Sequence, residues 1–141
     1  RWPGRFEILG EAPWFVVDGG HNPQCAGTVA ANLDTYFPGE KAVFLLGVLA
    51  DKDYKDMLSD LAPCFAKIYT VTPNCPRALS AEELQKEARF HTDAEAADSV
   101  AGAIRKAGDY ADENNLAGVV VCGSLYLAAE ARPLLLKEAE K

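Results

Sequence analysis

The chain has 141 residues, 49% of them hydrophobic and 25% charged, with a formal net charge of -7 at pH 7. This is the composition of a soluble globular protein, and the length suits one domain, 1–141, with a substantial core. The acidic balance argues against nucleic acid or an anionic membrane as the main partner, although a local site could still bind a nucleotide.

Membrane and metal-binding patterns are missing from the sequence. No apolar run approaches the roughly 20 residues of a membrane span, and no signal peptide is evident. A zinc site needs clustered ligands, and the two histidines, His21 and His91, lie far apart. With no CxxC pair, we expect free thiols in a reducing, cytoplasmic compartment. The cysteines are Cys25, Cys64, Cys75 and Cys122.

Strand and helix patterns alternate along the chain. The strand-like segments are nearly continuous in apolar character, as expected for strands covered on both faces, except that 5–9 alternates like an edge strand. The helical segments show apolar stripes at helical spacing. In chain order we predict strands at 5–9 and 14–17, a helix at 25–37, a strand at 42–46, a helix at 54–65, a strand at 68–71, helices at 80–90 and 100–110, a strand at 119–122 and a helix after 123.

This alternation predicts an α/β fold. Short links between strands and helices favour parallel strands with right-handed crossovers, in a Rossmann-like, doubly wound sheet with helices on both faces. In such a sheet, ligands bind beyond the carboxyl ends of the strands. That rule selects four loops: 18–22, 47–52, 72–76 and 123–124.

The segment VVDGGHNPQ, residues 16–24, turns sharply from a buried strand into a helix. Asn22 can cap the helix, and Pro23 suits its first position. Asp18 ends the strand, where a carboxylate can accept hydrogen bonds from ribose hydroxyls. His21 lies beside a helix amino terminus, which favours an anion. The residues alone leave an alternative open, in which Asp18 binds loop amides and His21 is structural.

Four ordered motifs resemble a known family. They are WPGRFE at 2–7, DGGHNP at 18–23, GVLADKDY at 47–54 and GSLYLAAEAR at 123–132. As an ordered set, they resemble the carboxyl-terminal domain of folylpolyglutamate synthase and dihydrofolate synthase, in the Mur ligase superfamily. One difference is Gly20, where the family usually has alanine.

The resemblance implies an ATP-dependent ligase that joins L-glutamate to a folate or dihydropteroate carboxylate through an acyl phosphate. It also implies that the phosphate-binding loop and the Mg²⁺ ligands belong to a larger, covalently linked amino-terminal ATPase domain. No GxxxxGK[ST] loop occurs in this chain. We therefore expect no metal ligands here, and no ligation by the chain alone.

The family's functional residues can be transferred position by position. Arg5 resembles a linker arginine that contacts ATP, and Asp18 resembles a nucleotide-binding aspartate. His21, the predicted catalytic residue, and Ser124 match positions that handle glutamate near the reacting centre. Lys52 resembles a lysine that pairs with the carboxylate of the incoming amino acid. Ser124 is also a natural N-cap for the last helix, and the Lys52 loop could be mere solvated surface.

Other functions stay open at this point. The chain could be a non-catalytic, nucleotide-binding regulatory module, or part of another Mur-type amino-acid ligase. A phosphotransferase or hydrolase with Asp18 as nucleophile is a weaker alternative, because such enzymes commonly place a second acid where this chain has Gly20. The motifs do not indicate whether the first glutamate, later ones or both are added.

Overall fold

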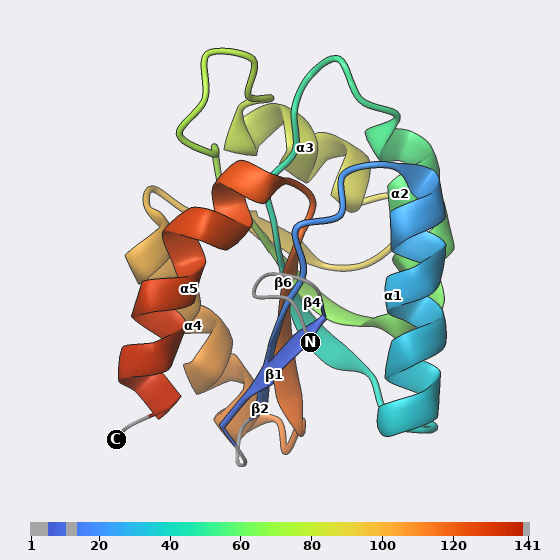
Figure 1. The fold of residues 1–141 in the computed structure, drawn as a ribbon, viewed down its shortest axis with the longest axis vertical. Helices are drawn as coiled ribbons and strands as arrows, with labels where there is room; N and C mark the ends of the chain where they lie inside the picture. The colour runs from blue at the N-terminus through green and yellow to red at the C-terminus, as the bar shows by residue number, and fades with distance from the viewer. Residues whose placement is uncertain (1–5, 11–13, 140–141) are drawn as a thin grey trace.

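The computed structural model describes residues 6–10 and 14–139 (Figure 1). Within these residues, six strands form one sheet in the order β1-β2-β6-β3-β4-β5. All neighbouring strands are parallel except β1 and β2, which are antiparallel. The strands are β1 (Glu7–Leu9), β2 (Trp14–Val17), β3 (Ala42–Leu46), β4 (Phe65–Thr70), β5 (Ala94–Ala96) and β6 (Gly118–Cys122).

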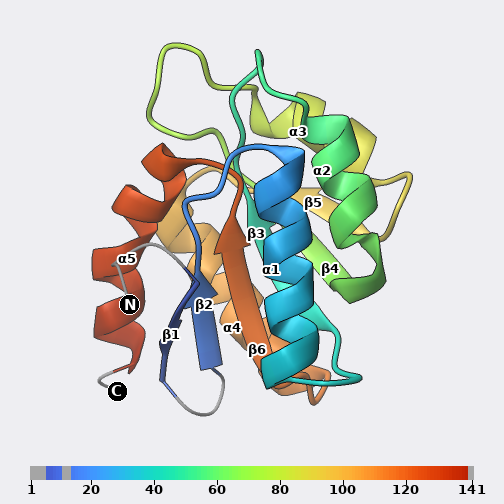
Figure 2. The same ribbon diagram turned by 45° about the vertical axis from the view of Figure 1, so that its right-hand side comes forward.

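Helices cover both faces of this sheet, which confirms the predicted doubly wound architecture. Helices α1, α2 and α3 pack on one face, and α4 and α5 pack on the other (Figure 1). In Figure 2, α1 crosses in front of the sheet and α4 lies behind it. The helices are α1 (Pro23–Tyr36), α2 (Tyr54–Leu61), the 3-10 turn η1 (Ala62–Cys64), α3 (Ala81–Ala88), α4 (Val100–Glu113) and α5 (Leu125–Ala139).

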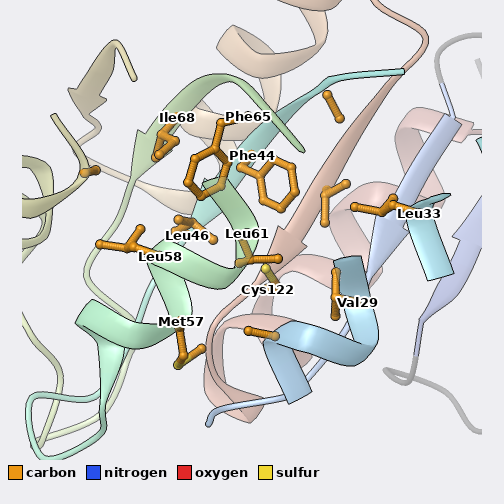
Figure 3. Close-up of a cluster of buried hydrophobic side chains, with 14 of the residues drawn as sticks. Val29, Leu33, Phe44, Leu46, Met57, Leu58, Leu61, Phe65, Ile68 and Cys122 are labelled. Carbon is orange, nitrogen blue, oxygen red and sulfur yellow. The ribbon is translucent and has the colours of Figure 1, made fainter. Parts of the chain in front are cut away.

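The central strands are buried on both faces. In β3, Phe44 and Leu46 point into the core under α1 and α2, whereas Val43 and Leu45 point toward α4 and α5. Figure 3 shows the first of these clusters, where the rings of Phe44 and Phe65 meet edge to face with centroids 4.8 Å apart. Because both faces are covered, these strands are apolar throughout rather than alternating.

Several element bounds differ from the prediction by one to three residues, and β4 runs over 65–70 rather than the predicted 68–71. Two differences are larger. The helix predicted to reach residue 65 ends earlier, because Pro63 closes it in the turn η1 and Phe65 already opens β4. Strand β5 was not predicted at all. Its three residues, Ala94–Ala96, lie at the sheet edge and have neither an apolar run nor β-branched side chains.

Two further expectations concern the cysteines and membranes. All four cysteines are free thiols, as predicted, and Cys122 is buried. Burial raises the pKa of the Cys122 thiol well above its ordinary value, which makes it a poor nucleophile. In the described part of the chain, no helix is both long and apolar enough to cross a bilayer.

Candidate functional site

The carboxyl ends of β2, β6, β3 and β4 lie side by side at one edge of the sheet, the upper edge in Figure 1. Because these neighbouring strands are parallel, the loops that follow them gather there. One cavity of about 170 Å³ opens at this edge. Its lining residues are His21, Leu49, Lys52, Arg77, Ser124, Leu125 and Tyr126. The fold thus brings together three of the residues selected from the sequence.

His21 and Lys52 contribute cationic or titratable groups to this cavity. His21 directly precedes the cap of α1, where the Asn22 side chain accepts a hydrogen bond from the Cys25 amide at 2.9 Å. Lys52 lies in the loop between β3 and α2. Within the described residues, neither the imidazole nor the ammonium group has a hydrogen-bond or ion-pair partner. Both side chains are half-buried and therefore available to an anionic ligand.

Ser124 is positioned by a tight turn. Gly123 has φ of +120°, and a Cβ there would lie 2.5 Å from the Gly47 carbonyl oxygen, so only glycine fits the turn. The buried Ser124 hydroxyl accepts a hydrogen bond from the Leu127 amide at 3.0 Å. Ser124 therefore is the predicted N-cap of α5. Its own hydroxyl proton is not used in that bond and can be donated into the cavity.

Asp18 lies apart from this cavity. It lines a second one, of about 200 Å³, together with Gln24, Cys25 and Thr28. The Asp18 residue is 8% exposed, and its two carboxylate oxygens accept hydrogen bonds from the amides of Phe6, at 2.8 Å, and Gly20, at 2.7 Å. The geometry is that of the alternative in which Asp18 binds loop amides. Each oxygen keeps a lone pair that a ligand hydroxyl could still use.

Gly20 is required by the same turn. A Cβ at this position would lie 2.5 Å from the Cys25 Cβ and 2.8 Å from Asp18 Oδ1. The turn is therefore packed tightly around glycine, and Cys25 occupies the adjacent space.

Arg5, the predicted ATP contact, lies outside the described residues. Among the residues that are described, no three histidine, cysteine or acidic side chains cluster in a way that could hold a metal ion.

Arg77 is a cavity residue that sequence reasoning missed. The strand-end rule selected the loop after β4 but stopped at Pro76, one residue short. Two backbone hydrogen bonds join this loop to the loop after β3: the Ala50 amide donates to the Arg77 carbonyl at 2.8 Å, and the Leu79 amide donates to the Val48 carbonyl at 2.9 Å. This pairing, which depends on tertiary structure, turns Arg77 toward the cavity.

Comparison with known proteins gives a consistent result. Residues 4–125 match the family model described as Mur ligase, glutamate ligase domain. The chain is 37% identical over 94% of its length to a probable bifunctional folylpolyglutamate synthase/dihydropteroate synthase of Haloferax volcanii, of which it covers 16%. It is 33% identical over 96% of its length to the folylpolyglutamate synthase of Lacticaseibacillus casei, of which it covers 30%.

A solved structure agrees with these relatives. The folylpolyglutamate synthase of Mycobacterium tuberculosis, solved with ADP, superposes with a TM-score of 0.87 at 32% identity. The match covers 96% of the present chain and 32% of that one. The chain thus spans about a third or less of the proteins that it resembles.

Proposed function

The chain belongs to the Mur ligase family of glutamate ligase domains, and from this premise we propose that it is the carboxyl-terminal domain of an ATP-dependent ligase that adds L-glutamate to folate or dihydropteroate. The proposed larger enzyme would carry its phosphate-binding loop and Mg²⁺ ligands in a covalently linked amino-terminal domain. We assign no step of this chain to a metal ion.

The observation that supports this proposal is the shared cavity of His21, Lys52 and Ser124. Three separate loops bring these side chains to one place at the edge where parallel sheets bind ligands. The cavity holds a cation, a titratable imidazole and a hydroxyl donor. These are the groups that an anionic amino acid with a reacting amine requires.

The proposed reaction has two stages. ATP first phosphorylates the folate carboxylate, which yields an acyl phosphate and ADP. The glutamate amine then attacks the acyl carbon, the bond from that carbon to the phosphate oxygen breaks, and phosphate leaves. The amine loses a proton as the amide forms, so a nearby base assists the second stage.

Within this scheme, each side chain of the cavity has a role. Lys52 pairs with a carboxylate of the incoming glutamate and holds the amine in position for attack. His21 accepts the proton from the amine or stabilises the departing phosphate. Ser124 donates its hydroxyl proton to the bound amino acid. On the nucleotide side, Asp18 uses its remaining lone pairs for ribose hydroxyls, and Arg5 contacts ATP.

The four free thiols suit a reducing compartment, so we propose that the enzyme acts in the cytoplasm.

The test uses the complete open reading frame that contains this sequence, expressed as the full-length protein. Purified protein is incubated with ATP, Mg²⁺, L-glutamate and either dihydropteroate or a reduced folate. We expect ADP release that depends on glutamate, with a product heavier by one glutamate residue in mass spectrometry. Nucleotide binding without glutamate incorporation would instead support a regulatory module. Incorporation of a different amino acid would indicate another Mur-type ligase.

A further inference from the structure

The cavity residue Arg77 is held by a side chain from the loop after β3. Its Nη1 lies 3.0 Å from Oδ2 of Asp51, in the loop after β3. Tyr126, in the first turn of α5, lines the same cavity as Arg77. The Tyr126 side chain and the Asp51 carboxylate together raise the pKa of the Arg77 guanidinium. Arg77 is therefore tied to the loop after β3 and shares the cavity with the first turn of α5.

The backbone beneath this contact is also fixed. Leu49 and Ala78 form an antiparallel bridge between the two loops, flanked by the hydrogen bonds of Arg77 and Leu79 described above. The two loops thus form a small paired ribbon above the sheet. Asp51 and Arg77 lie on opposite sides of this ribbon. Their ion pair therefore joins the same two loops that the backbone hydrogen bonds already join.

We propose that Asp51 is a positioning residue, which holds the Arg77 guanidinium so that it faces a carboxylate of the amino acid bound in the cavity. The inference rests on the proposed function, because it requires a dicarboxylic amino acid at this site. Lys52 offers a compact charge to one carboxylate, whereas the planar fork of Arg77 suits a second. A guanidinium fixed before binding loses less conformational freedom when the ligand arrives.

This role makes a prediction opposite to that of simple electrostatics. A negative side chain next to an anion-binding site repels the ligand, so removing it should strengthen binding by Coulomb's law alone. If Asp51 instead orients Arg77, removing the Asp51 carboxylate weakens binding although the site becomes more positive. The sign of the change therefore distinguishes the two effects.

The kinetic experiment compares four variants of the full-length protein: Asp51→Asn, Asp51→Glu, Arg77→Ala and Asp53→Asn. Asp53→Asn is the matched control, because it removes the same charge from the same loop and the Asp53 side chain makes no capping hydrogen bond. We expect Asp51→Asn to raise KM for L-glutamate roughly threefold to fivefold, the upper part of the range for an exposed ion pair. Arg77→Ala should raise it about tenfold or more. Asp53→Asn should not raise the KM for glutamate, and Asp51→Glu, which keeps the carboxylate, should raise it less than Asp51→Asn does. The KM for ATP should stay within about twofold of the wild-type value in all four variants.

A second measurement does not depend on catalysis. NMR relaxation of the Arg77 Nε–H group in the present chain reports how firmly the guanidinium is held. We expect a rigid group in the wild type and in Asp53→Asn, and a mobile one in Asp51→Asn. An Arg77 side chain that is equally mobile in the wild type and in Asp51→Asn overturns the positioning role, whether or not the enzyme is active.

The remaining outcomes separate the two hypotheses. A full-length protein that incorporates no glutamate refutes the proposed function, and the NMR result then decides the positioning role of Asp51 alone. An active wild type whose KM for glutamate is unchanged or lowered by Asp51→Asn refutes the positioning role and leaves the ligase function intact.

Discussion

Lys52 and Lys67 show two different uses of the same side chain. Lys67, in β4, is 8% exposed, and its ammonium group lies 2.6 Å from the Asp93 carboxylate. It also lies 5.4 Å and 5.5 Å from the ring centroids of Tyr69 and Tyr110. Lys52 has no such partner among the described residues and lines the cavity.

This difference indicates that the charge of Lys67 stabilises the folded domain, whereas the charge of Lys52 is available to bind a ligand. The attractive interactions of Lys67 are already made within the domain, so they contribute to folding and leave little for binding. The charge of Lys52 is half-buried yet unpaired in the described structure, as is the His21 imidazole. Substitutions in the two groups should therefore have opposite consequences for stability and activity.

The largest effect is expected for His21→Ala in the full-length protein. Loss of a group that transfers a proton or stabilises the leaving phosphate should slow the joining step about 100-fold. The melting temperature of the present chain should hardly change, because a polar loop residue outside the core normally shifts stability by only about 0.5 kcal/mol. A destabilised chain with a fully active parent enzyme would show that His21 maintains the turn.

Asp18 should combine both behaviours, because it holds two amides and faces a separate cavity. Asp18→Asn replaces one of the two carboxylate oxygens with an NH2 group, which cannot accept a hydrogen bond, so the amide of either Phe6 or Gly20 loses its partner. We expect a loss of about 2 kcal/mol in the free energy of unfolding, measured by urea denaturation. If Asp18 also binds ribose, KM for ATP should rise about tenfold or more in the full-length protein. Unchanged stability would contradict the structural role, and an unchanged KM would contradict the ribose contact.

Lys67 should affect stability alone. Lys67→Ala removes a buried stem and a paired charge, so we expect about 2 kcal/mol lower stability and normal turnover per folded molecule. Lys67→Met is the matched control, since it keeps most of the stem and removes only the charge. Little stability should be lost in Lys67→Met, because the Asp93 side chain is 71% exposed and its carboxylate is solvated by water once the ammonium group is gone. Reduced turnover in folded Lys67→Ala would contradict the claim that Lys67, unlike Lys52, affects stability alone.

The smallest effect concerns Tyr69, whose ring packs beside Lys67. Burial, and then the charge of Glu95, raises the pKa of Tyr69 to about 12. The folded pKa lies above the unfolded value of about 10, so the contribution of Tyr69 to the free energy of unfolding is fully present below pH 10. This contribution is lost as the pH rises from 10 toward 12. Tyr69→Phe should remove that part of the pH dependence, measured as urea midpoints at pH 9 and above. Equal slopes for both proteins would show that Tyr69 titrates normally.

The sequence predicted the central part of the fold better than its edge. The bounds of β2 and β3 agree with the prediction, because strands buried on both faces produce uninterrupted apolar runs. The edge strand β5 has no such signal, since its pairing with β4 comes from tertiary packing rather than from its own residues. Pro63 could have indicated the end of α2. The prediction extended the helix to Phe65 because Phe65 follows Leu61 at a helical spacing.

The candidate site was predictable in part for a similar reason. The rule that ligands bind at strand ends selected the loops that hold His21, Lys52 and Ser124, and the family resemblance selected these residues within the loops. Parallel topology then brings the loops together. Arg77 depends on pairing between two loops, which no local pattern reveals. The Asp18 carboxylate accepts a hydrogen bond from the Phe6 amide, twelve positions earlier, and such long-range hydrogen bonds appear only in the folded chain.

The most direct test of the glutamate site is the KM for L-glutamate of full-length Lys52→Met, measured beside Lys67→Met. We expect the Lys52 variant to raise this KM about tenfold or more, through the loss of a charged hydrogen bond to the substrate carboxylate. Its KM for ATP and its melting temperature should match those of the wild type, and Lys67→Met should leave the KM for glutamate unchanged. An unchanged KM for glutamate in Lys52→Met, with the protein folded and active, would contradict the assignment of this cavity to the incoming amino acid.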